Sequence, residues 1–453
     1  MTPSLAESTI ALYDINETRL RESAVMLEAI NRNNGSKARI ESYLGIENRK
    51  AALRGADYVV NAIQVGGYDP CTITDFEIPK KYGLRQTIAD TLGVGGVFRA
   101  LRTIPVLMDF ARDMEEVCPD AWLLNYSNPM AMLTGAVLRY SGIKTVGLCH
   151  SVQVCCSRLM HELGMTGYPE TQWKIAGINH QAWLLECTRD GADLYPEIRR
   201  RALLYNRGEL DIGTLEERIA VMTEGMDNVE PRMLERIKQE YETYKATGKH
   251  GDMVRLELMR RFGYYITESS EHNSEYTPYF IKDRYPELIG RYNIPLDEYP
   301  RRCIRQIEEW KERSRELTSD PNLTHVRSRE YASYIMNAME TDEPTRIGGN
   351  VLNNGLITNL PRNACVEVPC LVDRNGVQPT FIGDLPEQCA ALNRTNINVQ
   401  LMAIEASRTH KKETVYQAVM LDPHAGAELS IDDIVAMCDE LFEAHRGWMP
   451  EYH

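Results

Sequence analysis

The 453-residue sequence has no long uninterrupted run of apolar residues. No stretch approaches the roughly 18 residues that mark a membrane-spanning helix, and the segment from Met1 to Leu12 has no basic region followed by an apolar core. We therefore expect neither a transmembrane span nor a secretory signal. The sequence predicts a cytoplasmic protein without a membrane partner.

Positive charge is also scarce. The chain carries 51 Lys and Arg against 65 Asp and Glu, a formal net charge of -14. Nucleic-acid binders normally concentrate basic residues on one face, so we expect no nucleic-acid partner. A small-molecule ligand is the expected partner, and a chain of this length can form two or three domains with a cleft between them.

The cysteines do not form the pattern of a disulfide framework. There are 11 of them, an odd and scattered number, and Cys149, Cys187 and Cys370 lie within apolar runs. This usage is typical of buried thiols in a reducing compartment. No internal repeat or low-complexity tract is visible.

Short apolar, β-branched runs alternate with helical segments in the first third of the chain. Expected strands include residues 10–14, 58–62, 122–125 and 146–149, and expected helices include 17–31 and 95–116. Strands joined by crossover helices pair in parallel, so the pattern predicts an α/β, Rossmann-like doubly wound parallel sheet.

The remainder of the chain differs in composition and in the spacing of its apolar residues. Residues 203–261 are rich in charge with Met and Leu at helical spacing, which predicts solvated amphipathic helices. A helix at 331–339, short strands up to Gly383 and two helical stretches ending near His445 predict a mixed α+β domain. We expect a division into residues 1–185 and 186–453.

Several residues follow expected strands. Asp14 ends the first apolar run, where a dinucleotide fold places an acid against the ribose, although a helix-capping Asp has the same pattern. Cys149 and His180 also follow apolar runs and could share a divalent ion. On spacing alone this indication is weak, because two ligands are too few for a closed structural site, and a buried thiol and a satisfied histidine explain the pattern better. Asn125 and Asn128 precede Pro129 and are candidate ligand contacts, although an Asn-Pro pair is also typical of a turn.

Gly93, Gly95 and Gly96 could be mistaken for a phosphate-binding loop, but their spacing differs from that motif. We interpret them as a substrate-side loop that opens the helix carrying Arg99. Asp90, just before them, is a candidate active-site acid, although an isolated Asp there is also common in turns.

Taken together, local strings along nearly the whole chain resemble glycoside hydrolase family 4. The strings are ALYDIN (11–16), QVGGY (64–68), ADTLGVGG (89–96), LNYSNPMA (124–131), GLCHSV (147–152), AGINH (176–180), TESSEH (267–272), and NLP to VEVP (359–369). The resemblance implies a Rossmann-like domain followed by a domain similar to the C-terminal domain of lactate and malate dehydrogenases. It also implies NAD+ and a divalent metal, usually Mn2+, as cofactors.

The resemblance assigns roles to individual residues. It implies that Cys149 and His180 bind the metal, with sugar hydroxyls completing the coordination. The implied NAD+ contacts are Asp14, Gln64 and Asn125. The implied substrate contacts are Asn128, Asn179 and Arg99.

The implied reaction differs from hydrolysis by two carboxylates. NAD+ removes hydride from C3 of the sugar, a base takes the C2 proton, the aglycone leaves by elimination, and water then adds as the steps reverse. The candidate base is Tyr276, with Glu268, Glu271, His272 and Tyr265 nearby. The candidate acids for the leaving group are His150 and Asp90.

The string Cys-His-Ser, which begins at residue 149, resembles the sequence at this position in the branch of the family that acts on alpha-galactosides. Glucuronides and galacturonides are the nearest alternative substrates. Members of the family are generally dimers or tetramers, so the resemblance implies a homodimer or homotetramer.

The chain departs from the family at its beginning. The first strand and the glycine-rich loop that holds the NAD+ pyrophosphate are missing, which should leave an exposed sheet edge. A misassigned start at Met1 or a shortened chain explains this, and a non-catalytic sugar-binding relative is an alternative. A further hypothesis is that the protein is a simple 2-hydroxy acid dehydrogenase. The Cys149 and His180 pair is evidence against this hypothesis.

Overall fold

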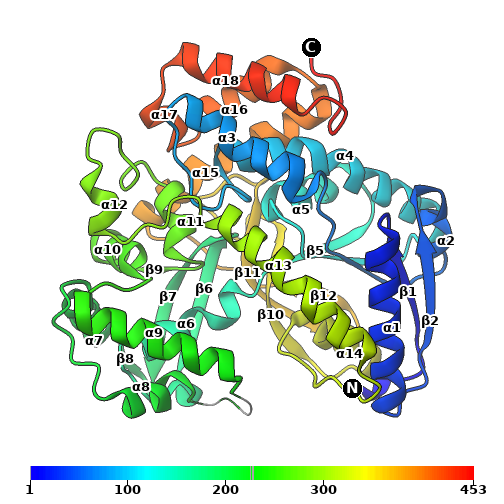
Figure 1. The fold of residues 1–453 in the computed structure, drawn as a ribbon, viewed down its shortest axis with the longest axis horizontal. Coiled ribbons are helices and arrows are strands. Elements are labelled where there is room, and N and C mark those ends of the chain that lie inside the picture. The colour runs from blue at the N-terminus through cyan, green and yellow to red at the C-terminus, as the bar shows by residue number, and fades with distance from the viewer. Residues whose placement is uncertain (1, 225, 227–228) are drawn as a thin grey trace.

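The computed structural model describes residues 2–224, 226 and 229–453, so the predicted misassignment at Met1 lies outside the described residues. A mixed sheet runs through the centre of the molecule with helices on both sides (Figure 1). The C-terminal helices lie at one end, and β1, β2 and α1 lie together at the side of the sheet.

The central sheet has ten strands in the order β3-β4-β5-β10-β11-β6-β7-β8, with β12 beside β11 and β9 beside β7. Strands β3, β4 and β5 are parallel, as predicted, whereas β10 pairs antiparallel with β5 and begins an antiparallel half. The strands are β3 (Tyr58–Asn61), β4 (Trp122–Asn125), β5 (Lys144–Leu148), β6 (Gln172–Ile178), β7 (Gln181–Arg189), β8 (Ala192–Asp193), β9 (Tyr265–Ile266), β10 (Thr345–Leu352), β11 (Cys365–Asp373) and β12 (Gly376–Pro379). Because this sheet joins strands from both sides of residue 185, the two-domain division stays a prediction.

Strands β1 (Thr9–Asp14) and β2 (Arg39–Leu44) form a separate parallel pair connected by α1 (Glu17–Asn33). Helix α1 begins where the side chain of Asn16 accepts a hydrogen bond from the backbone N–H of Arg19. Among the described strands, β1 pairs only with β2 and β3 pairs only with β4.

An apolar core lies between the sheet and the helices at the C-terminal end of the molecule. Helix α4 (Gly93–Val117) contributes Val97, Leu101 and Ile104, one helical face, all buried. Burying each such side chain stabilises the fold by roughly 1.5–3 kcal/mol. The sequence predicts two final helical stretches, but the structure has four helices: α15 (Glu387–Thr409), α16 (Lys412–Met420), α17 (Ala425–Glu428) and α18 (Ile431–Ala444). Helix α15 ends because His410 is left-handed, with φ of 54°.

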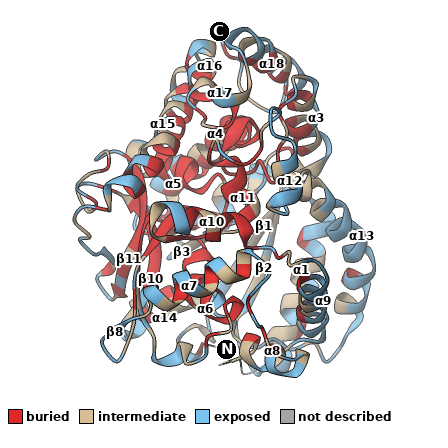
Figure 2. Ribbon diagram, turned by 90° about the vertical axis from the view of Figure 1, so that its left-hand side faces the viewer, coloured by how far each residue is buried: buried red, intermediate tan, exposed pale blue. Residues whose placement is uncertain are grey.

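The charged middle of the chain forms helices, as predicted, joined by non-helical segments such as residues 207–214 and 248–252; residues 225 and 227–228 lie outside the described residues. Helices α9 and α13 are largely exposed (Figure 2). In the described part of the chain, no helix combines the length and the apolar character needed to cross a membrane. The remaining α-helices are α2 (Arg49–Leu53), α3 (Ile73–Lys81), α5 (Met130–Tyr140), α6 (Ser151–Glu162), α7 (Tyr195–Asn206), α8 (Leu215–Met222), α9 (Pro231–Thr247), α10 (Met253–Phe262), α11 (Ser270–Glu275), α12 (Glu287–Arg291), α13 (Glu298–Ser319) and α14 (Tyr331–Thr341).

One row of paired residues crosses the sheet and aligns the strands. The row runs through Asn61, Asn125, Gly147, Asn350, Glu367 and Gly177. A Cβ atom at Gly147 would lie 2.6 Å from Met130 Sδ and from Thr134 Oγ1, so only glycine fits there. Cys149 follows the last residue of β5, and Asn179 follows the last residue of β6.

Candidate active site

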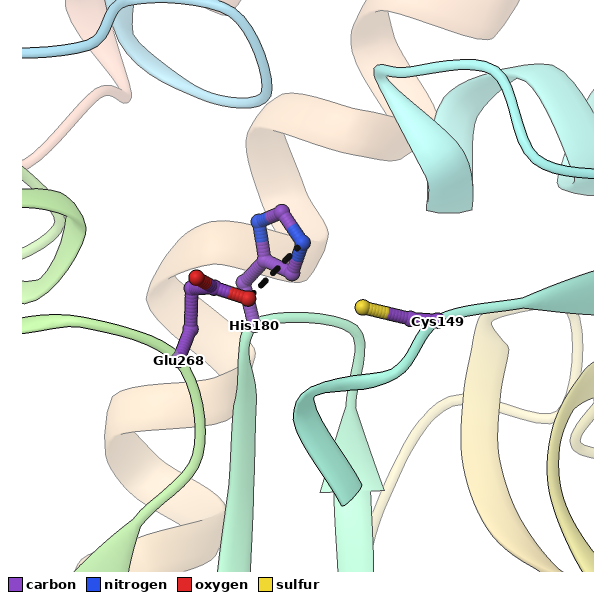
Figure 3. A group of neighbouring side chains, drawn as sticks. All are labelled: Cys149, His180 and Glu268. Atoms are coloured by element: carbon purple, nitrogen blue, oxygen red, sulfur yellow. Dashed lines mark ion pairs between the residues drawn. The ribbon is translucent and has the colours of Figure 1, made fainter. Parts of the chain in front are cut away.

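Three side chains from separate elements point into one space (Figure 3). Cys149 follows β5, His180 lies in the turn between β6 and β7, and Glu268 follows β9. One ligand atom from each lies within 4.8 Å of the other two, and His180 Nε2 is 3.4 Å from Glu268 Oε2. Within the described residues, these three make up the group of His, Cys, Asp and Glu that could hold a metal ion.

The backbone turns sharply at two of these positions. His180 has φ of 63° and Glu268 has φ of 66°, both in the left-handed region. Non-glycine residues there carry strain of order 1 kcal/mol, which the surrounding structure must offset. Both residues bring a ligand atom within 4.8 Å of the thiol of Cys149.

The electrostatics of the cluster suit a divalent cation. Burial lowers the pKa of His180 to about 4, with Glu268 opposing it, so the ring is neutral at neutral pH. Burial alone would raise the pKa of Glu268, but His180, His272 and Arg255 lower it to about 2. Burial, together with Glu367 and Glu268, raises the pKa of the Cys149 thiol. A divalent cation would favour the thiolate, giving two anionic ligands and one neutral imidazole.

A second group of side chains lies beside the cluster. His272, on α11, has Nε2 3.6 Å from Asp90 Oδ1 and Nδ1 3.7 Å from Glu268 Oε1. Its Nδ1 also lies 2.8 Å from the hydroxyl of Ser269. The rings of His180 and His272 meet edge to face at 5.0 Å. The predicted catalytic residues Asp90, Glu268 and His272 therefore form one connected group with the metal candidates.

Opposite charges shift the pKa values of this group apart. Burial alone would lower the pKa of His272, but Asp90, Glu268 and Glu275 raise it to about 9. Burial alone would raise the pKa of Asp90, but His272 and Arg99 hold it well below its ordinary value. At neutral pH, His272 is therefore a cation between two carboxylates.

The predicted base, Tyr276, is fully buried, and its hydroxyl is 3.3 Å from His180 Nδ1. Burial raises its pKa well above 10, and the negative charges of Asp90, Glu275 and Glu268 add to this effect. The phenol therefore needs a nearby positive charge to lose its proton near neutral pH.

The structure places two of the three predicted substrate contacts together. Arg99, on α4, donates from Nε to the carbonyl of Asn128 at 3.3 Å and from Nη1 to the hydroxyl of Tyr299 at 3.1 Å. Asn179 is buried against Glu367. Tyr299 had no signal of its own in the sequence, because its partner lies on a distant helix.

The predicted NAD+ contacts are spread over the ends of β1, β3 and β4. The Asp14 carboxylate accepts a hydrogen bond from the N–H of Asn16 and pairs with Arg19 at 3.1 Å. Gln64 is exposed after β3. Asn125 is fully buried, accepts a hydrogen bond from Asn61 Nδ2 and donates one to Thr134. The roles of these residues stay predictions.

The remaining candidate acid, His150, lies at the rim of the site. Its side chain is exposed and lies 3.7 Å from Glu330 on the loop before α14. Its charge still affects the pKa values of His180 and Glu268.

A buried carboxyl group near the cluster is not among the site residues that the sequence predicts. Glu367 is fully buried on β11, accepts a hydrogen bond from Asn350 Nδ2 at 2.9 Å, and has a pKa raised by burial to about 8. The string VEVP contains it, but only the pairing of β11 with β10 and β6 shows where it lies.

Comparison with known proteins agrees with this geometry. Residues 1–165 match the family model of family 4 glycosyl hydrolase, and residues 175–425 match that of the family 4 glycosyl hydrolase C-terminal domain. The chain therefore belongs to family 4 of the glycosyl hydrolases, and it is a glycosidase.

The chain is also similar to individual proteins over most of its length. The chain is 58% identical over 452 residues to an alpha-galactosidase of Bacillus subtilis (strain 168), covering 100% of this chain and 94% of that one. It is 33% identical to an alpha-galactosidase of Rhizobium meliloti (strain 1021), covering 99% and 85%. Its fold is similar to that of a 6-phospho-alpha-glucosidase from gut microorganisms solved in complex with NAD and Mn2+, with a TM-score of 0.72, 18% identity, and 98% and 93% coverage.

Proposed function

We propose that the protein hydrolyses alpha-galactosides and that it requires NAD+ and a divalent cation, with Mn2+ as the expected ion. Both named relatives by sequence are alpha-galactosidases, and one of them is similar over the whole chain. The observation that carries the proposal is the convergence of Cys149, His180 and Glu268. Three ligands leave coordination positions for sugar oxygens, as in catalytic rather than structural metal sites.

When bound, NAD+ would exchange a hydride with C3 of the sugar, and the cation would stabilise negative charge on the substrate oxygens. The chain supplies the proton transfers. If Nε2 of His180 binds the ion, the ring proton is on Nδ1 and is donated to the oxygen of Tyr276. That hydrogen bond favours the phenolate, so it supports Tyr276 as the base that takes the C2 proton.

We propose His272 as the proton donor to the leaving group. The carboxylates of Asp90 and Glu268 lie 3.6 Å and 3.7 Å from its two ring nitrogens, and they raise the pKa of the ring, which favours the protonated form. Asp90, which the sequence suggests as an acid, is ionised at neutral pH because His272 holds its pKa low. Asp90 therefore holds His272 protonated and oriented, and His150 stays the alternative donor at the rim.

Hydrolysis of aryl glycosides tests the proposed substrate and cofactors. Aryl alpha-galactoside, alpha-glucoside and alpha-galacturonide would be compared with NAD+, Mn2+ and a thiol reductant present, and then with NAD+ omitted or a chelator added. We expect turnover of the alpha-galactoside that stops when either cofactor is removed. Turnover that continues when NAD+ is omitted and a chelator is added would exclude the mechanism. A preference for the alpha-galacturonide would exclude alpha-galactosides as the proposed substrate.

We further propose a cytoplasmic homodimer or homotetramer. The 11 cysteines are free, and all except Cys303 are buried, which supports a reducing compartment. Ile304, Ile307 and Trp310 on α13 are exposed, which supports a contact between subunits. Size-exclusion chromatography with light scattering would measure the assembly, and a monomer at micromolar concentration would contradict it.

A further inference from the structure

One buried carboxylate accepts hydrogen bonds from the backbone of the loop that carries Asp90. Glu275, the last residue of α11, is 2% exposed. Its Oε2 accepts a hydrogen bond from the backbone N–H of Thr87 and its Oε1 accepts one from Ala89, both at 2.8 Å. The N–H of Ile88 between them is 3.3 Å from both oxygens. One side chain thus satisfies three consecutive backbone donors.

Residues 82–92, between α3 and α4, have no regular secondary structure. The carbonyl of Glu271 and the N–H groups of Asp297 and Tyr299 hydrogen-bond Gln86 and Thr87 at the start of the segment, whereas Glu275 binds the N–H groups that lead to Asp90. Ala89 has φ of 48°, a left-handed conformation that a free loop of L-residues rarely keeps. The Glu275 carboxylate accepts a hydrogen bond from the N–H of Ala89. Charge-assisted hydrogen bonds of this kind are about twice as strong as neutral ones.

The loop is also clamped from its other side. A Cβ atom at Gly95 would lie 2.7 Å from the carbonyl oxygen of Ala89, and one at Gly96 would lie 2.7 Å from the carbonyl carbon of Thr91. The first turn of α4 therefore lies directly against the loop. Held between α4 and α11, the loop has little room to adopt a different path while these contacts persist.

Helix α11 presents two functional groups to this loop. His272 and Glu275 are three residues apart, so they lie on one face of the helix. Glu275 holds residues 87–89, and His272 meets the next residue, Asp90, at 3.6 Å. The oxygens of Glu275 are engaged by backbone donors, which leaves this carboxylate to hold structure rather than to transfer protons.

We propose that Glu275 is a positioning residue, whose carboxylate fixes the backbone of residues 87–89 so that Asp90 meets His272. The catalytic consequence rests on the proposed function, whereas the loop anchoring does not. A glutamine at position 275 keeps the shape but replaces one acceptor oxygen with an NH2 donor that faces backbone N–H groups. An aspartate keeps the charge on a shorter side chain.

The test uses Glu275→Gln, Glu275→Asp and a matched control, Glu162→Gln. Glu162 is also buried and charge-paired, with Arg218, but contacts α8 rather than the loop. Hydrogen exchange of peptides covering residues 86–92, kcat and KM for the aryl alpha-galactoside, and Mn2+ affinity would be measured for each. We expect Glu275→Gln to lose at least about tenfold in loop protection and about 100-fold in kcat, since small displacements of catalytic groups have effects of this size. KM and Mn2+ affinity should change less than about threefold, and Glu275→Asp should recover part of both losses.

Glu162→Gln should lower the melting temperature without changing loop protection or kcat. In an Asp90→Asn background, Glu275→Gln should cost much less in kcat than in the wild type, because both changes act on one contact. Unchanged loop protection in both Glu275 variants, or full additivity with Asp90→Asn, would overturn the proposal. Should Glu275→Gln not fold, Glu275→Asp gives the same comparison. A wild-type protein inactive on galactosides would contradict the proposed function, while the exchange measurement would still decide the anchoring.

Discussion

The imidazole of His272 lies 3.6 Å from the carboxylate of Asp90, and this contact joins two regions far apart in the chain. Its other nitrogen faces Glu268, a candidate metal ligand. A protonated ring between two carboxylates links the proton chemistry of the site to its cation.

Replacing Asp90 with Asn should lower kcat about 100-fold or more, within the range of general acid–base effects. Burial and the loss of the carboxylate would lower the pKa of His272 from about 9. The donor must be protonated, so activity is lost as the pH rises through its pKa. The alkaline limb of the kcat/KM profile should therefore move to lower pH in the variant. An unmoved limb would show that His272 is not the group that titrates there.

Replacing Cys149 with Ala should weaken Mn2+ binding by more than the 10–100-fold loss typical of outer-shell partners, since a direct ligand is removed. The matched control is Cys118→Ala, because Cys118 is also buried but ends α4 away from the cluster. Isothermal titration calorimetry of both variants measures the affinity. Equal affinities in the two variants would remove Cys149 from the metal site.

Replacing Tyr276 with Phe should abolish exchange of the sugar C2 proton with D2O and lower kcat about 100-fold or more, while Mn2+ still binds. The phenol hydroxyl contacts His180 Nδ1, which the variant leaves without that partner, so a modest change in metal affinity is expected. NMR of the product formed in D2O reports the exchange. Deuterium at C2 in the variant at the wild-type rate would assign the base to another residue.

Replacing Glu367 with Gln should change how stability depends on pH. Burial raises the folded-state pKa of Glu367 from 4.5 to about 8, so its contribution to stability is present at low pH and is lost as the pH rises through this window. The slope is at most about 1.4 kcal/mol per pH unit. Glu367→Gln lacks this pH-dependent loss, so the difference between its melting temperature and that of the wild type should increase in favour of the variant from pH 5 to pH 8. The control is Glu316→Gln, at an exposed position, for which this difference should stay constant. Parallel melting curves for Glu367→Gln and wild type would contradict the raised pKa.

Much of the secondary structure is predictable from local patterns. The parallel strands β3, β4 and β5 and the helices α1 and α4 occur where apolar periodicity indicates them. Strand β2 is missed because Arg39–Leu44 mixes charged and polar residues with apolar ones and buries none of them. The insertion of β10 beside β5 is also missed, because strand order depends on pairing between distant segments.

The residue types of the site are equally visible, but their grouping is not. Local strings identify Cys149 and His180 as a pair, yet they give Glu268 only as one of several catalytic candidates near Tyr276. Only the turn after β9 shows that Glu268 completes the cluster.

The amino-acid sequence alone determined the family, the nucleotide-type sheet and the thiol–imidazole pair, because short strings and periodicity depend on neighbours along the chain. The tertiary structure decided which carboxylates meet which histidines, and it alone placed Glu275 under the Asp90 loop. The physical reason is that strand register, left-handed turns and desolvation set these distances and charges, and all three arise from contacts between segments remote in sequence.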